Sequence, residues 1–141
     1  MTLKIREIMT TDVTTISAKD SISDAANIMK QLDIGAVPVL DNNLLVGIVT
    51  DRDLVLRGLA DGKNATDSVS SVMTTNLTTV TPDADVHNVA DIMAAKQIRR
   101  LPIVENNHLV GIVAIGDMAV ESIFEDEAGE ALHNISMGVR H

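Results

Sequence analysis

Cysteine is absent from this sequence, and aromatic residues are nearly absent as well. Without cysteine the chain has no disulfide, no thiolate metal ligand and no thiol nucleophile. Phe124 is its single aromatic residue, since there is no Trp and no Tyr. Nucleic-acid bases therefore have no aromatic platform on which to stack, and a planar ligand has to lie against aliphatic side chains or backbone.

Long apolar runs and an excess of positive charge are missing too. No stretch approaches about 18 uninterrupted apolar residues, the length that a membrane-spanning helix needs. The first ten residues, MTLKIREIMT, lack the apolar segment of a signal peptide. We therefore expect a soluble, cytoplasmic protein with no membrane partner. The formal net charge of −9 repels phosphate backbones, so nucleic-acid binding is not expected.

The residue types that carry catalysis or bind metals form no recognisable set. The four histidines are not spaced as metal ligands. Asp51 and Asp53 offer only two carboxylates, with Arg52 between them. Gly62-Lys63 is not followed by the rest of a phosphate-binding loop. Because no nucleophile stands beside a base in any known pattern, we predict no metal site, no catalytic residue and no enzymatic activity.

What the chain does contain is an internal repeat. When its 141 residues are shifted by 64 positions, residues 9–53 align without a gap on residues 73–117, and 18 of the 45 aligned residues are identical. The phrase GIVTDRD at 47–53 returns as GIVAIGD at 111–117, with Ala114 in place of Thr50. Such self-similarity indicates a duplicated supersecondary unit.

The hydrophobic period changes in the same order within each copy. A Thr-rich extended stretch (13–16 and 77–80) is followed by an amphipathic helix, two short branched strands and a second helix (53–60 and 117–124). In the first helix of each copy, apolar residues recur at helical spacing. They are Ile22, Ala25, Ala26, Met29 and Leu32 in the first copy, and Val86, Val89, Ala90 and Met93 in the second. The sequence thus predicts an α+β fold built from two tandem β-α-β-β-α units.

The repeat resembles the CBS domain. The residues that carry the resemblance are MTT followed by VTTI or LTTV, the strands IGAVPVL and IRRLPIV, and the phrases GIVTDRD and GIVAIGD. It implies a CBS domain at 8–66, a second at 72–130 and a C-terminal tail at 131–141. Two such repeats in tandem are similar to a stand-alone Bateman module, in which a pseudo-twofold CBS pair binds adenosine nucleotides and regulates other proteins.

Thr50 and Asp53 are the first candidate site residues. A carboxylate can accept hydrogen bonds from both hydroxyls of a ribose, and by resemblance this Thr-x-x-Asp pattern holds ribose and phosphate. Thr-x-x-Asp is equally the pattern of a capping box, in which both side chains bond the backbone at a helix start. The two roles are compatible, because a capping side chain can also face a ligand.

Arg99 and Arg100 are the second pair of candidates. They precede LPIV where the first copy has Gly35-Ala36 before VPVL, and by resemblance they reach the phosphate of a nucleotide held by Thr50 and Asp53. Successive residues of a strand point to opposite faces, so one arginine alone can face the ligand. The alternative is a solvated basic pair on an acidic protein.

By resemblance the module has two equivalent crevices, and the candidates above belong to the first. The second has Asp117 and Ala114 but lacks the threonine hydroxyl and both arginines, so we expect a weaker or empty site there. Packing by Ala114 is the alternative. Adenine needs apolar walls and backbone hydrogen bonds, and its candidate contacts are also plausible core residues. They are Thr15, Ile16, Ile34 and Val37.

The resulting hypothesis is a regulatory sensor of AMP, ADP or ATP that changes a dimer surface or the surface for an unidentified target protein. We expect a homodimer through the helices 53–60 and 117–124, and no tightly required cofactor. The alternative is a ligand-free scaffold for dimerisation or protein interaction. It predicts that Asp53→Ala costs stability, through lost capping, and nothing else.

Overall fold

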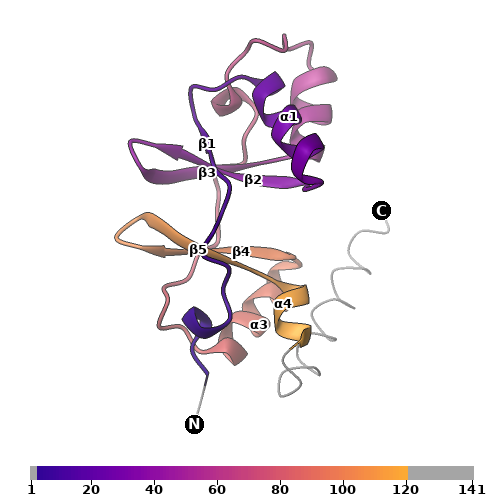
Figure 1. Cartoon of the computed structure of the whole chain (residues 1–141). Helices are drawn as coiled ribbons and strands as arrows, with labels where there is room; N and C mark the ends of the chain where they lie inside the picture. Colours follow the sequence, from indigo (N-terminus) through magenta and orange to yellow (C-terminus); the bar gives the residue numbers. More distant parts are fainter. Residues whose placement is uncertain (1–2, 121–141) are drawn as a thin grey trace. The chain divides into compact units, whose positions relative to one another are not determined.

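The computed structural model describes residues 3–120, and these fold into two compact units (Figure 1). One unit consists of residues 14–77 and is called the 14–77 unit. The other combines residues 3–13 with residues 78–120 and is called the split unit. Each mixes helices with strands, which confirms the predicted α+β class.

The 14–77 unit follows the predicted order of elements. They are β1 (Ile16–Ser17), α1 (Ile22–Leu32), β2 (Ala36–Asp41), β3 (Leu44–Thr50), α2 (Asp51–Asp53), the π-helical turns η2 (Leu54–Leu59) and the 3-10 turn η3 (Val69–Ser71). The sheet order is β1-β2-β3, with β1 parallel and β3 antiparallel to β2. A helix was expected at 53–60, but the chain turns helical at Asp51 and continues as a π-helix, whose bonds include Ala60 N–H to Val55 O at 2.8 Å.

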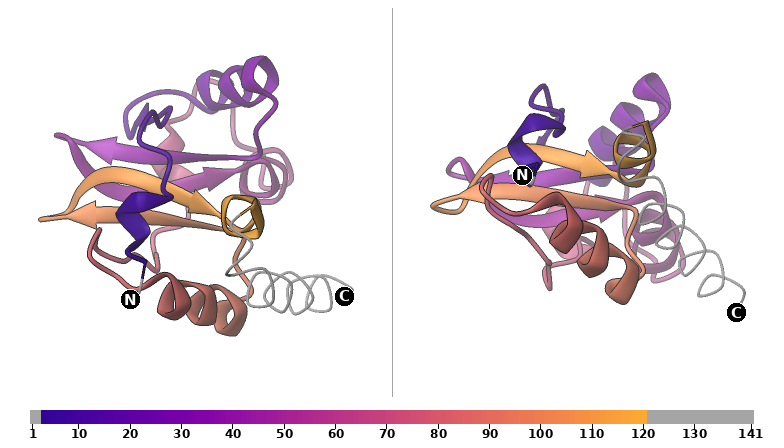
Figure 2. Two further views of the ribbon diagram at one scale, coloured as in Figure 1. Left: turned by 60° about the horizontal axis from the view of Figure 1, so that its bottom comes forward. Right: turned by 90° about the horizontal axis from the view of Figure 1, so that it is seen from below.

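The split unit repeats this plan on η1 (Ile5–Glu7), α3 (Val86–Lys96), β4 (Arg100–Glu105), β5 (His108–Ala114) and α4 (Ile115–Val120). Val80 pairs in parallel with Ile103, which matches the place of β1 in the other unit. Figure 2 shows α3 lying along one face of the β4–β5 hairpin. Of the helix expected at 117–124, the part beyond Val120 lies outside the described residues, as does the predicted tail.

Both hairpins turn through paired asparagines. Asn42 and Asn43 have φ angles of 51° and 67°, and Asn106 and Asn107 have φ angles of 53° and 66°. Two consecutive residues at positive φ define the type I′ turn, whose twist suits a two-residue hairpin and which asparagine tolerates. The DNN and ENN motifs therefore set the pairing next to each turn, and a register shift between Val39 and Leu40, or between Ile103 and Val104, follows further along the strands.

Each unit contains one sequence repeat together with a segment from outside that repeat. Thr10 pairs with Ile112 on β5, and Thr74 pairs with Ile48 on β3. The N-terminal stretch thus belongs with the second copy, and the linker between copies belongs with the first. The domain boundaries at 66 and 72 stay a prediction.

Each unit has its own apolar core between its sheet and its first helix. In the split unit this core includes all four predicted residues of α3. In the 14–77 unit Ala25 and Met29 are buried, but Ala26 is exposed and Leu32 is 50% exposed. The prediction for these two was wrong. Leu32 is the last helical residue before Asp33 turns left-handed, and Ala26 is exposed although its counterpart Ala90 in α3 is buried.

Candidate functional site

Thr50 and Asp53 form the capping box that joins β3 to α2. Thr50 ends the strand in an extended conformation, and its Oγ1 accepts the Asp53 N–H at 3.0 Å. Asp53 Oδ2 in turn accepts the Thr50 N–H at 3.0 Å. Two N–H groups at the helix start are thereby satisfied reciprocally, so the capping interpretation of this pattern describes the local structure.

Asp53 has more partners than the cap requires. The carboxylate is buried, with 8% of the residue exposed. Thr74 Oγ1 donates to Asp53 Oδ2 at 3.2 Å and lies 3.3 Å from Oδ1. Arg57 Nε lies 4.0 Å from Oδ1, while Arg57 Nη1 donates to the Met73 carbonyl at 3.2 Å. A buried carboxylate needs such partners because desolvation penalises its charge.

Thr74 and Arg57 were not found from the sequence. Arg57 could have been found, because it stands four residues after Asp53 on a helical segment, the spacing at which opposite charges meet. Thr74 is part of the MTT motif, which occurs in both copies. Nothing in the sequence says that the motif of the second copy packs beside the aspartate of the first.

The arrangement leaves chemistry available at both side chains. Thr50 Oγ1 uses one lone pair for the Asp53 N–H, and its own O–H can still donate. An ionised carboxylate has about four acceptor positions, and the shorter hydrogen bonds to Asp53 concentrate on Oδ2. Asp53 Oδ1, which lies 3.3 Å from Thr74 Oγ1 and 4.0 Å from Arg57 Nε, keeps one acceptor position beyond the cap.

The four candidate adenine contacts divide into two pairs. Ile16 and Val37 belong to the core of the 14–77 unit, with 4% and 0% of their surfaces exposed. At these two positions the structure therefore agrees with the alternative, in which the residues pack in the core. Thr15 and Ile34 are half-buried. Only this second pair retains side-chain surface that a ligand could contact in the structure.

Arg99 and Arg100 occupy the same backbone positions as Gly35 and Ala36 in the other unit. Ile115 N–H donates to the Arg99 carbonyl at 3.0 Å, as Asp51 N–H donates to the Gly35 carbonyl at 3.0 Å. Both arginines are exposed.

Arg100 on β4 stands directly opposite Ala114 on β5, whereas Ala36 stands opposite Thr50. The lost threonine and one gained arginine are therefore cross-strand neighbours within one unit. Sequence reasoning did not foresee this relation, because it depends on the strand register. Asp117 lies in α4, and its side chain is outside the part of the chain that the structure describes.

Comparison with known proteins supplies the family. The model of the CBS domain matches residues 5–59 and 69–122. The chain belongs to the CBS domain family. It carries two tandem CBS domains, as the sequence predicted, and is 46% identical over 132 residues to the CBS domain-containing protein YhcV of Bacillus subtilis (strain 168), with 94% of each chain covered.

Solved structures of CBS proteins share the fold. A putative acetoin utilization protein (AcuB) from Vibrio cholerae is 32% identical with a TM-score of 0.80, and the match covers 92% of this chain and 97% of that one. The CBS domain pair of protein MJ0100, in complex with 5′-methylthioadenosine and S-adenosyl-L-methionine, is 28% identical with a TM-score of 0.74, covering 90% and 99%. The chain is thus a member of the CBS-pair family of regulatory modules.

The sequence predicted neither a membrane-spanning segment nor a metal site, and the described residues were searched for both. Within residues 3–120 no helix combines the length and the apolar character that crossing a membrane requires. In the same part of the chain, no three His, Asp or Glu side chains gather closely enough to hold a metal ion. The cytoplasmic location stays a prediction.

Proposed function

We propose that this CBS pair is a regulatory sensor of an adenosine nucleotide, AMP, ADP or ATP. The observation that carries the proposal is the buried Asp53 carboxylate at the end of β3, held by Thr50, Thr74 and Arg57 with acceptor capacity left on Oδ1. The solved structure of the MJ0100 CBS pair contains two adenosine compounds. This supports the proposal that a chain of the same fold binds an adenosyl ligand.

In this proposal the ribose hydroxyls donate to Asp53 and the Thr50 hydroxyl donates to a phosphate or ribose oxygen. Thr15 and Ile34, which retain exposed surface, contact the adenine. The resemblance adds Arg99 or Arg100 as the cation for the phosphate, since guanidinium groups bind phosphate oxygens strongly. Asp117 and Ala114 form the weaker counterpart, because Ala114 has no hydroxyl to donate.

The proposed output is a change of the dimer or partner surface. On η2 the apolar side chains Val55, Leu56 and Leu59 are 54%, 46% and 78% exposed, which supports the homodimer through 53–60 and 117–124. A nucleotide can shift such a surface only through different affinities for two arrangements. The proposed role is regulatory and not catalytic, and the target is an unidentified protein.

The test is isothermal titration of the full chain with AMP and ATP, after denaturation and mass spectrometry of any small molecule that copurifies. Calorimetry is chosen because the chain has no Trp or Tyr. We expect about one site per chain, abolished in Asp53→Ala and weakened in Arg99→Ala or Arg100→Ala. Two equal sites would contradict the proposed weakness of the Ala114 position.

Asp24→Ala is the matched control. Asp24 closes the capping box of α1, in which its Oδ2 accepts the Ser21 N–H at 3.0 Å, so its loss removes a cap away from the candidate site. The sensor proposal requires that Asp24→Ala lose stability but keep nucleotide binding. If the wild type binds no adenosine ligand and both variants only lose stability, Asp53 is a cap and the scaffold alternative replaces the sensor.

A further inference from the structure

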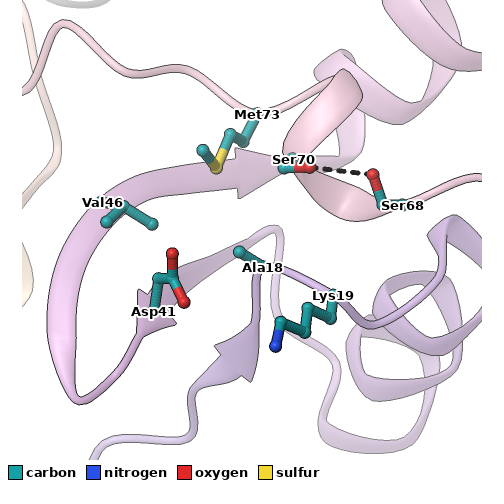
Figure 3. A pocket seen from close by; sticks show the side chains of 7 residues that line it. All are labelled: Ala18, Lys19, Asp41, Val46, Ser68, Ser70 and Met73. Carbon is teal, nitrogen blue, oxygen red and sulfur yellow. Dashed lines mark hydrogen bonds between the residues drawn. The ribbon is translucent and has the colours of Figure 1, made fainter.

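A cavity of about 510 Å³ opens near the hairpin turn of the 14–77 unit. Asp41 ends β2 beside this turn, whereas Thr50 ends β3 at the other end of the hairpin, so the cavity is separate from the capping box. Its apolar wall consists of Ala18, Val46 and Met73, and its polar groups come from Lys19, Asp41, Ser68 and Ser70. Figure 3 shows Asp41 and Lys19 on either side of Ala18.

The split unit carries other side chains at the equivalent backbone position. Ser70 N–H donates to the Ala18 carbonyl at 3.3 Å, and Arg6 N–H donates to the Pro82 carbonyl at 3.2 Å. Both pairs are related by the 64-residue offset of the repeat. Arg6 is therefore the structural counterpart of Ser70, although it precedes the part of the chain where the sequence repeat is evident.

The same offset makes Asp83 the counterpart of Lys19. In the split unit Arg6 and Asp83 form an ion pair, and Lys4 Nζ donates to the Asp83 carbonyl at 3.4 Å. The guanidinium group and the carboxylate thus satisfy each other across this position.

In the 14–77 unit the charge at this position is reversed and its partner is missing. Lys19 replaces the aspartate, and Ser70 replaces the arginine with a short, uncharged side chain. Ser70 Oγ instead lies 2.8 Å from Ser68 Oγ. Among residues 3–120, neither Lys19 nor Asp41 takes part in an ion pair. Both residues are exposed, so the rim of the cavity presents one cation and one anion to solvent.

We propose that this cavity binds a zwitterionic amino acid with an apolar side chain. The ligand carboxylate pairs with the Lys19 ammonium group and accepts a hydrogen bond from the Ser70 hydroxyl, at the backbone position where the split unit has the Arg6–Asp83 pair. The ligand ammonium group pairs with Asp41, and its side chain lies against Val46 and Met73. The cavity volume falls within the range of small-molecule sites.

The charge pattern restricts the ligand class. A simple anion would leave Asp41 without a partner and bring a second negative charge beside it, and a simple amine would do the same to Lys19. Only a molecule with both charges satisfies both groups. The site does not depend on the adenosine proposal, because its residues are separate from Thr50 and Asp53.

The test is an amide NMR titration of the full chain with L-leucine, beside isocaproate, which lacks the ammonium group, and isoamylamine, which lacks the carboxylate. We expect leucine to shift the signals of Lys19, Asp41 and Ser70. Loss of either charge-assisted contact weakens binding by about tenfold or more. Equal binding of leucine and isocaproate, or no shift at these residues, would overturn the proposal.

The decisive variant is Lys19→Asp/Ser70→Arg, which copies the ion pair of the split unit into the 14–77 unit. The same pair is accommodated on the equivalent backbone, so this variant should fold and lose leucine binding while any nucleotide binding stays unchanged. Lys30→Asp, a charge reversal on the exposed side of α1, is the control and should keep leucine binding. Undiminished leucine binding in the double variant would show that the cavity is not the site.

Discussion

Gly47 lies where the segment Met73–Thr74 packs against β3, and replacing it with alanine tests that packing. A Cβ atom at position 47 would lie 2.6 Å from Met73 Sδ and 2.9 Å from the Thr74 carbonyl oxygen. Distances under 3.0 Å are not tolerated between such atoms, so either the segment or the strand has to move. Gly47→Ala is therefore an overpacking substitution.

The free-energy cost of Gly47→Ala depends on whether the two atoms nearest the new methyl group can move. The Met73 thioether ends a flexible side chain, which can adopt another rotamer. The Thr74 carbonyl cannot move alone, because it accepts the Ile48 N–H at 2.9 Å while Thr74 N–H donates to the Ile48 carbonyl at 2.8 Å. Overpacking of this kind costs typically about 1–3 kcal/mol, and the fixed carbonyl places Gly47→Ala near the upper end of that range.

The assay is urea unfolding followed by circular dichroism, compared with Gly116→Ala. Gly116 lies in α4, and a methyl group there would meet no atom within 4 Å apart from its chain neighbours and the backbone of its own helix, so alanine should stabilise by roughly 0.5–1 kcal/mol. Because the strand would push Thr74 away from Asp53, Gly47→Ala should also weaken nucleotide binding if the proposed site is correct. An unfolding free energy equal to that of the wild type would refute the described packing of Met73–Thr74 on β3.

Two further substitutions test the core and the support of Asp53. Leu101→Ala removes a fully buried side chain and should cost about 2–5 kcal/mol, whereas Leu32→Ala, at a half-exposed position, should cost less than about 1 kcal/mol; urea midpoints separate the two. Thr74→Val deletes the hydroxyl that donates to Asp53 and should cost about 1–2 kcal/mol, against no change for the exposed Thr75→Val. An unchanged midpoint in Thr74→Val would show that the Thr74 hydroxyl is not needed to hold the carboxylate.

Local features of this fold could be predicted because they depend on neighbouring residues. Paired asparagines between branched runs identified both hairpins, and the spacing of Val86, Val89, Ala90 and Met93 identified the buried face of α3. Thr50 and Asp53 were recognised as a possible capping box for the same reason. In each case the deciding interaction joins residues that lie within a few positions of one another.

Features that depend on contacts distant in sequence could not be predicted. Thr74 reaches Asp53 from 21 residues away, and the N-terminal stretch completes the second copy through Thr10 and Ile112. The π-helical course of η2 was also missed, since an apolar period near 3.6 residues does not distinguish bonds to the fourth residue from bonds to the fifth. The contacts between distant residues can be identified only after the pairing of the strands is known.

The two units share one backbone plan and differ in the side chains at equivalent places. At the strand ends, Ala36 opposite Thr50 becomes Arg100 opposite Ala114, a coupled change across one hairpin. If Ala114 served packing alone, the residue opposite it would have no reason to become a long exposed cation. In the proposed function, this change puts the Thr50 hydroxyl on one unit and the Arg100 cation on the other. The variant pair Ala36→Arg/Thr50→Ala tests this argument, because it gives the 14–77 unit the side chains of the other strand end. It should fold, keep the hairpin and lose nucleotide binding, whereas retained binding would leave packing as the sufficient explanation.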